Sequence, residues 1–342
     1  MVIPYGRLFS TVSAQRGYIA MIRYTIKRLL LMIPVVLGVT ILIFTIMYFT
    51  PGDPAQLIMG PNASPQQVAE KRTEMGLDRP YFTRLFDYIS DVFIHGDLGN
   101  SYMNNRSVSA EIMERFPRTA LIAFMSVLLS LIVGIPIGIA SAVGQNTWRD
   151  RVAMVVSLLG VSMPEFWLGL MLVILFSLKL GWLPPSGIGS VSHYVLPCIA
   201  CSFFGIAGMA RQTRSSMLEV IRADYITTAR VKGQSESKVI YSHALRNALI
   251  PIITTVGGAF GMSLGGALVI ETVFSIPGIG LYMCKAINSR DYPAIQGSVI
   301  FLAIAFSLVM LITDLVYALV DPRIRSQYQG KKKARRSAKE GA

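Results

Sequence analysis

Charged side chains are scarce in this chain: only 15% of its 342 residues are Asp, Glu, Lys or Arg, against 53% hydrophobic residues. A soluble domain carries about 25% charged residues, so the composition predicts a protein whose solvent is a membrane. The three cysteines give no disulfide framework, and the three histidines form no metal-binding pattern. Because G-x-x-x-x-G-K-[ST] is absent, we expect no ATP bound through a P-loop of this chain.

Two short matches to catalytic patterns are better explained by packing. Residues 261–265 fit G-x-S-x-G, but a nucleophile elbow needs a strand-to-helix turn and a histidine partner, and this segment is an apolar helix. Cys198 and Cys201 fit C-x-x-C, but they lie in an apolar span without a second pair. We therefore expect no catalytic residue, no metal, no cofactor and no enzyme activity.

The basic residues are distributed unevenly, and the formal net charge is +13. Seven of them lie between Arg211 and Arg246 and eight follow Asp321, whereas the two short loops predicted on the opposite side carry only Lys179, Lys285 and Arg290. This asymmetry follows the positive-inside rule and predicts cytoplasmic termini and a cytoplasmic loop at 213–248. We expect no nucleic-acid binding, because no basic face carries stacking aromatics.

Six apolar runs are long enough to cross a bilayer, at residues 29–49, 119–143, 152–178, 195–212, 249–273 and 297–320. The fold class predicted is an all-α integral membrane protein with six transmembrane helices. We divide it into a flexible extension (1–20), a first transmembrane helix (21–49), an external helical insert (50–118), a core domain with five transmembrane helices (119–320) and a basic cytoplasmic tail (321–342). The tail segment 331–336 is expected to anchor on anionic membrane lipid.

The polar insert has clear helix signals. Ser64, Pro65 and Gln67 predict an N-cap, a proline in the first turn and a capping box, and Gly76 predicts the end of that helix. After Pro80, apolar residues recur at helical spacing as far as Phe93 and predict an amphipathic helix. The insert is too short for a separate enzyme domain.

A second polar segment, residues 222–251, separates two apolar blocks. Helix-tolerant residues run from Asp224 to Lys232, Gly233 follows, and Ser235 can begin a second helix. This pattern predicts a short helical hairpin on the membrane surface, because so polar a segment is excluded from lipid.

Glycines and acids within the spans are candidates for the translocation pathway. Gly257, Gly261 and Gly265 repeat every four residues, which indicates either a moving or pore-lining helix pair at a subunit interface or static tight packing. Gly134 and Gly138 form a weaker version of the pattern in the second span.

The acids of the spans must face protein or water, because burying one in lipid is expensive. Glu165 follows Pro164, which should bend the third span, and its carboxylate can meet a cationic substrate or a neighbouring helix. Glu271 is expected at a gate or structural hinge, and Asp314 is expected to pair helices.

The hairpin also carries motifs of a known family. Residues 228–233 read T-A-R-V-K-G and residues 243–251 read H-A-L-R-N-A-L-I-P, which resemble the coupling loop of ABC-importer permeases of the dipeptide, oligopeptide and nickel branch. PGDP (51–54), HGDLGNSY (95–102) and ETVFSIPGIG (271–280) extend the resemblance. It implies these ATPase-coupling residues: Asp224, Thr228, Ala229, Arg230, Lys232, Gly233, His243 and Arg246. Thr227 stands where the wider superfamily has a glutamate, and Asp224 is the nearest substitute.

The resemblance implies a permease subunit for peptides that works with a second homologous permease, two cytoplasmic ATP-binding subunits and an external substrate-binding protein. Nickel, metal chelates and glutathione remain alternative solutes. An ion-coupled secondary carrier is a second class, but it would show an internal repeat and paired charges within the membrane. An intramembrane hydrolase is a third, but Ser263 has no evident catalytic partner in the sequence.

Overall fold

The computed structural model describes residues 5–320, and every regular element in this range is a helix. In chain order these are α1 (Tyr5–Phe49), α2 (Pro54–Met59), α3 (Pro65–Glu74), α4 (Tyr81–Ser90), the π-helix η1 (Asp91–His95), α5 (Val108–Val143), α6 (Trp148–Ser162), α7 (Glu165–Leu172), η2 (Val173–Lys179), α8 (Ser192–Ile221), α9 (Asp224–Val231), α10 (Glu236–Lys238), η3 (Val239–Ala244), α11 (Leu245–Val273), α12 (Ile279–Ser289) and α13 (Tyr292–Val320). The predicted all-α class is confirmed. The tail 321–342 lies outside the described residues.

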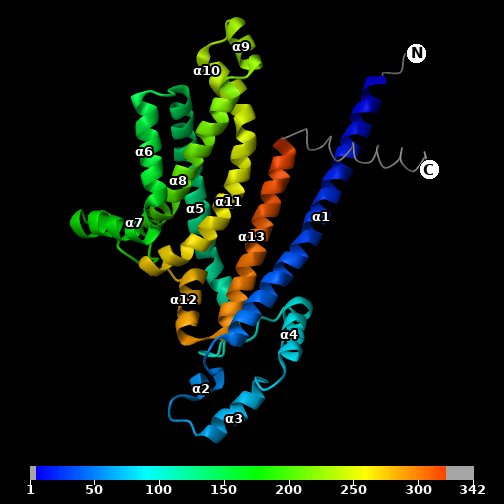
Figure 1. The fold of residues 1–342 in the computed structure, drawn as a ribbon, viewed down its shortest axis with the longest axis vertical. Helices are drawn as coiled ribbons and strands as arrows, with labels where there is room; N and C mark the ends of the chain where they lie inside the picture. The colour runs from blue at the N-terminus through cyan, green and yellow to red at the C-terminus, as the bar shows by residue number, and fades with distance from the viewer. Residues whose placement is uncertain (1–4, 321–342) are drawn as a thin grey trace.

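The long helices stand side by side as a bundle, and the two polar segments lie at its opposite ends (Figure 1). α9 and α10 project from one end, toward which α1 begins and α13 ends. α2, α3 and α4 cluster at the other end, near α12. The predicted hairpin and the predicted insert are therefore separated by the length of the bundle.

Five helices are long and apolar enough to cross a membrane, over Tyr24–Phe49, Val108–Val143, Ser192–Ile221, Glu236–Val273 and Tyr292–Val316. Two boundaries differ from the sequence prediction. α1 begins at Tyr5, so residues 5–20 are helical and no break marks residue 20. The second span, predicted to begin at residue 119, is part of a longer helix: α5 begins at Val108 and accommodates Pro117 and Pro136.

The third span is sharply broken. α6 and the α7–η2 pair meet at 102°, and Met163 and Pro164 at the break have extended backbones. The predicted bend at Pro164 is confirmed, and the two bent parts together count as a possible sixth span. α6 has 15 residues and measures about 22 Å, less than the ~30 Å of a bilayer core, so it crosses only with the help of its bent partner.

Helices α5 and α8 cross at close range. A Cβ atom on Gly134 would lie 2.8 Å from the carbonyl oxygen of Ile206, and one on Gly138 would lie 2.6 Å from that of Ala210. Only residues without a side chain permit this approach, which brings the two backbones into contact. The glycines that the sequence ranked second thus bring two long helices into backbone contact.

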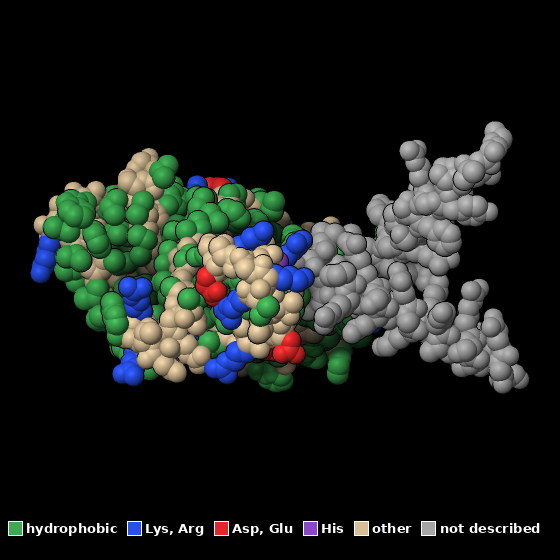
Figure 2. Space-filling view, turned by 90° about the horizontal axis from the view of Figure 1, so that it is seen from above, with side chains coloured by type: hydrophobic (Ala, Val, Ile, Leu, Met, Phe, Trp, Pro, Cys, Tyr) green, Lys and Arg blue, Asp and Glu red, His purple; other side chains and the backbone are tan. Residues whose placement is uncertain are grey.

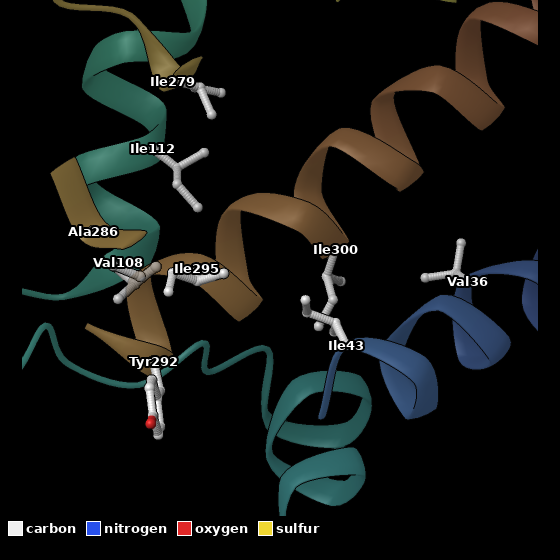
Figure 3. Packing of buried hydrophobic residues seen from close by; sticks show 10 residues of the cluster. Val36, Ile43, Val108, Ile112, Ile279, Ala286, Tyr292, Ile295 and Ile300 are labelled. Carbon is white, nitrogen blue, oxygen red and sulfur yellow. The ribbon is translucent and has the colours of Figure 1, made fainter. Parts of the chain in front are cut away.

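A hydrophobic cluster holds the insert end of the bundle together (Figure 3). It joins α1, α5, α12 and α13 through Val36, Ile43, Val108, Ile112, Ile279, Ala286, Tyr292, Ala294, Ile295 and Ile300. Near it, Ser101 Oγ donates to Asp291 Oδ2 at 2.5 Å. Farther along the bundle, Arg28 of α1 pairs with Asp314 of α13 at 3.0 Å, which confirms the helix-pairing role expected for Asp314.

Candidate functional site

The hairpin between α8 and α11 is formed as its sequence predicts. α9 runs from Asp224 to Val231, and the chain reverses at Gly233, whose φ of +75° lies in the left-handed region. Such a φ favours glycine, because a Cβ atom would crowd the backbone. The backbone N–H of Gly233 donates to Arg230 O at 2.9 Å and closes the end of α9. Ser235 then has an extended backbone at the start of α10.

Polar contacts brace the two arms of the hairpin. Arg230 Nη2 and Nε donate to the Glu236 carboxylate at 2.6 and 3.1 Å, a bidentate pair across the Gly233 turn. These hydrogen bonds raise the pKa of Arg230, so it stays charged. His243 Nε2 and Gln234 Oε1 are 2.7 Å apart, so His243 serves the hairpin's own structure.

The inner face of the hairpin is apolar. Ile226 and Ala229 of α9 are buried in a cluster with Met217, Val239 and Ile240 from α8 and η3. Of the eight residues implied by the resemblance, Ala229 therefore faces the bundle and His243 is half-buried. The other six are exposed: Asp224, Thr228, Arg230, Lys232, Gly233 and Arg246.

The outer face combines positive charge with exposed apolar groups. Val231 at the tip is 83% exposed, and Tyr225 and Tyr241 are also exposed. Figure 2 looks onto this end of the molecule and shows Lys and Arg side chains gathered there. A surface of this kind fits a protein partner, because exposed aromatic and aliphatic groups beside basic ones are typical of interfaces.

The hairpin is connected directly to a long membrane helix. α10, η3 and α11 follow one another without a break, so helical backbone extends from Glu236 to Val273. Asn247 Nδ2 also donates to Tyr225 OH at 3.0 Å, which ties α9 to the start of α11. A displacement of the hairpin would therefore move α11 with it.

The three predicted glycines of α11 do not share one neighbour. Gly257 faces Thr313 of α13, to which a Cβ atom would come within 2.6 Å, and Gly261 faces Phe306. Gly265 has nothing within 4 Å of its Cβ position. The reason is geometric: residues four apart are about 40° apart around a helix of 3.6 residues per turn, so the row rotates away from α13.

A separate stripe on α11 is open. Six exposed residues follow at intervals of four, four, three, four and three: Thr254, Gly258, Met262, Gly265, Val269 and Thr272. Within residues 5–320 most of this stripe is uncovered: Met262 is 61% exposed, and only near its end does Thr272 Oγ1 reach Cys284 Sγ of α12 at 3.8 Å. The spacing places all six on one side of the helix. Gly265 is the one predicted glycine that belongs to it.

The two predicted acids have different surroundings. Glu271 is fully buried: Thr119 Oγ1 donates to Oε1 at 2.6 Å, and the backbone N–H of Leu281 donates to Oε2 at 3.0 Å. It therefore satisfies the N-terminus of α12, which fits the predicted hinge position. Glu165 is half-buried at the start of α7, and no hydrogen bond or ion pair joins it to the described part of the chain.

A buried ion pair was missing from the sequence prediction. Arg214 of α8 donates to Asp150 of α6 through Nε at 2.7 Å and Nη2 at 2.8 Å. Ser141 of α5 and the backbone N–H of Asn146 also donate to this carboxylate. The pair locks three helices together at the hairpin end. No sequence motif indicates this pair, because its members are 64 residues apart. In the sequence analysis Arg214 is one of the basic residues assigned to the loop at 213–248.

At the opposite end, a cavity of about 340 Å³ lies between the insert and the ends of α1 and α13. Tyr48, Arg84, Tyr88, Tyr102 and Tyr292 contribute to its wall. Burial raises the pKa of Tyr102 to about 12, so its phenol stays protonated. The cavity is separate from the open stripe of α11.

Comparison with known proteins identifies the family. Residues 134–326 match the family described as binding-protein-dependent transport system inner membrane component, and residues 21–123 match the N-terminal region of such membrane components. The glutathione transport system permease protein GsiC of Salmonella choleraesuis (strain SC-B67) is 44% identical over 305 residues, covering 89% of this chain and 99% of that protein. The dipeptide transport system permease protein DppB of Alkalihalophilus pseudofirmus is 43% identical over 333 residues, covering 89% of this chain and 100% of that protein.

A solved structure supports the fold. An inward-facing structure of the MetNI methionine ABC transporter superposes with a TM-score of 0.54 at 17% identity, covering 62% of this chain and 96% of that one. With the apolar helices and the two family matches, this places the chain in the inner membrane as a multi-pass protein. The chain belongs to the inner membrane components of binding-protein-dependent transport systems and is a permease subunit of an ABC importer.

Proposed function

We propose that this permease forms one half of an import route for small peptides and carries out no chemical step itself. The solute class is supported by two relatives of similar identity whose names specify glutathione and dipeptide transport. Both solutes are short peptides, so a pathway lined by the same kinds of side chain would accept either. The energy would come from separate ATPase subunits.

The hairpin carries this proposal. Its inner face is buried and internally braced, whereas its outer face presents Val231, Lys232 and Arg246 to the surroundings. Two cytoplasmic ATPase subunits, one for each permease of a pair, would bind such tips. The continuous helix from Glu236 to Val273 would then transmit their movement into the membrane.

The open stripe of α11 supports a shared pathway. It contains Gly258 and Gly265, whose Cβ positions have nothing within 4 Å in the described part of the chain, so a second homologous permease would complete the route along it. Glu165 remains a proposed pathway residue, while Gly257 and Gly261 are explained by packing on α13. A substrate-binding protein would deliver peptide at the insert end.

The domain limits remain part of the proposal. Residues 21–49 would anchor the insert 50–118, residues 119–320 would form the transport core, and the basic tail 321–342 would lie at the cytoplasmic surface with the hairpin. The charge distribution along the chain supports this orientation.

Substitution of Val231 by Asp tests the docking surface. We expect V231D to insert normally but to lose co-purification with the ATPase subunits and to lower peptide import at least about tenfold, since a buried, unpaired carboxylate at an interface costs more than 1.4 kcal/mol. Import would be measured in cells that lack the native permease, with membrane levels checked by immunoblot.

The matched control is Val191→Asp. Val191 is 84% exposed, as is Val231 at 83%, but it immediately precedes α8 at the other end of the bundle. V191D should keep its ATPase subunits. Full assembly and import by V231D would show that the hairpin tip is not the docking surface.

A further inference from the structure

The helix α4, with its continuation η1, has two apolar faces. Its inner face packs on the last turns of α1: the rings of Tyr81 and Tyr48 are 5.0 Å apart, and those of Tyr88 and Phe44 are 5.5 Å apart. The hydroxyls of Tyr81 and Thr45 are 2.7 Å apart and form a hydrogen bond. α4 is therefore fixed to the side of α1 (Figure 1).

The outer apolar face is uncovered. Phe82, Phe86, Phe93 and Ile94 are 41–77% exposed. Phe82 and Phe86 are four residues apart and lie on one side of α4, and Phe93 and Ile94 are exposed on its continuation η1. Large aromatic groups gathered in this way on an exposed helix indicate a binding surface.

A polar face lies beside the aromatic one. Thr83 and Asp87 are exposed, and Arg79 Nη1 donates to Asp87 Oδ2 at 2.9 Å. A helix with an aromatic face next to a charged face is suited to the boundary between lipid and water. A surface that binds a water-soluble partner can lie at any distance from the membrane, whereas one that binds lipid must lie at the boundary between hydrocarbon and headgroups.

The depth of α4 is set by α1. The apolar residues 29–49 of α1 span about 31 Å, close to the ~30 Å of a bilayer core. Phe44 and Tyr48 then lie within about 8 Å of the end of the span. α4, packed beside them, lies at the level where hydrocarbon meets headgroups. Leu42 and Phe49 of α1 are exposed at the same level.

We infer that α4 and η1 lie in the membrane interface, with Phe82, Phe86, Phe93 and Ile94 inserted into the lipid of the leaflet at the insert end. This is the outer leaflet in the orientation proposed above, and only the name of the leaflet rests on that proposal. The occupant is lipid because the aromatic face continues the lipid-exposed side of α1. The insert is thereby held at a fixed height beside the mouth of the bundle.

Spin labels on neighbouring residues test the inference in the full chain reconstituted in phospholipid vesicles. Phe82→Cys and Phe86→Cys place labels on the aromatic face, and Thr83→Cys is the matched control on the polar face. The unaltered chain, with Cys198, Cys201 and Cys284, gives the labelling background. We expect labels at 82 and 86 to be several-fold more accessible to oxygen than to a water-soluble nickel chelate, and the label at 83 to show the reverse.

Two results would overturn the inference. High accessibility of labels 82 and 86 to the nickel chelate would place the face in water. Low accessibility to both reagents would show that protein covers it, which in these vesicles can only be this chain or a second copy of it. Neither result bears on ATPase docking at the hairpin, which the V231D experiment tests separately.

Discussion

Charged residues inside the bundle are held by several partners each. Asp150 accepts from Arg214, Ser141 and Asn146, and Glu271 accepts from Thr119 and Leu281. An unpaired charge in a low-dielectric interior is costly, so such residues are retained only where donors converge on them. These two acids therefore act in structure, whereas Glu165 has no hydrogen bond or ion pair with residues 5–320.

Replacing Asp150 by Asn should destabilise the chain strongly. The change leaves the half-buried Arg214 guanidinium without its carboxylate, and breaking a buried pair in this way costs about 3 kcal/mol. The thermal unfolding temperature in detergent would fall well below that of the wild type.

Asp224→Asn is the control for this measurement, since Asp224 is exposed on α9 and should tolerate the change. Equal unfolding temperatures for D150N and D224N would contradict the structural role of the pair.

Helices in this protein pack most closely where glycine replaces a larger residue. At the α5–α8 crossing, Gly134 faces a backbone carbonyl, whereas Gly265 of α11 faces open space. Because apolar side chains gain little by leaving lipid for one another, close backbone contact is what joins such helices. Glycine in a span thus marks either a crossing or an open face, and only the neighbouring helix distinguishes them.

Adding one methyl group at each glycine separates the two cases. Gly134→Ala should cost about 1 to 3 kcal/mol, because the new Cβ would overlap Ile206 O and Met209 Cβ at 2.8 Å. Gly265→Ala should leave the unfolding temperature unchanged or raise it slightly, since alanine is the better helix former. If both variants unfold alike, the α5–α8 crossing is looser than described.

The whole molecule is organised by its two polar ends. The hairpin lies at one end of the bundle and the insert at the other (Figure 1). Basic residues concentrate in the hairpin segment, while the insert balances basic with acidic residues. By the positive-inside rule, we propose that the hairpin faces the cytoplasm.

Single cysteines test this orientation. We expect Asn62→Cys in the insert to react with a membrane-impermeant maleimide in intact cells, and Val231→Cys in the hairpin to react only after permeabilisation. Both positions are exposed on the chain itself, so in cells that lack the ATPase subunits access depends on the side of the membrane alone. Labelling of V231C in intact cells would show that the hairpin faces outward, which contradicts the proposed orientation.

Much of the site was predictable because its signals are local. The hairpin follows from Asp224, Gly233 and Ser235 within a dozen residues, and its motifs reveal the family. The sequence did not reveal that Ala229 faces the bundle or that Arg230 is engaged by Glu236, because both depend on how α9 folds back on α10. It also gave no indication of the open stripe on α11, which is defined by the absence of neighbours.

The sequence by itself determined the membrane setting, the positions of five spans and the turn of the hairpin, because each depends on composition or on residues a few positions apart. The bend at Pro164 was predicted as well, although its angle of 102° was not. The tertiary structure decided the pairing of Asp150 with Arg214 and the hydrogen bond from Thr119 to Glu271. These features join residues up to 152 positions apart, as Thr119 and Glu271 are. Such contacts are selected by how helices meet in space, and no local pattern encodes them.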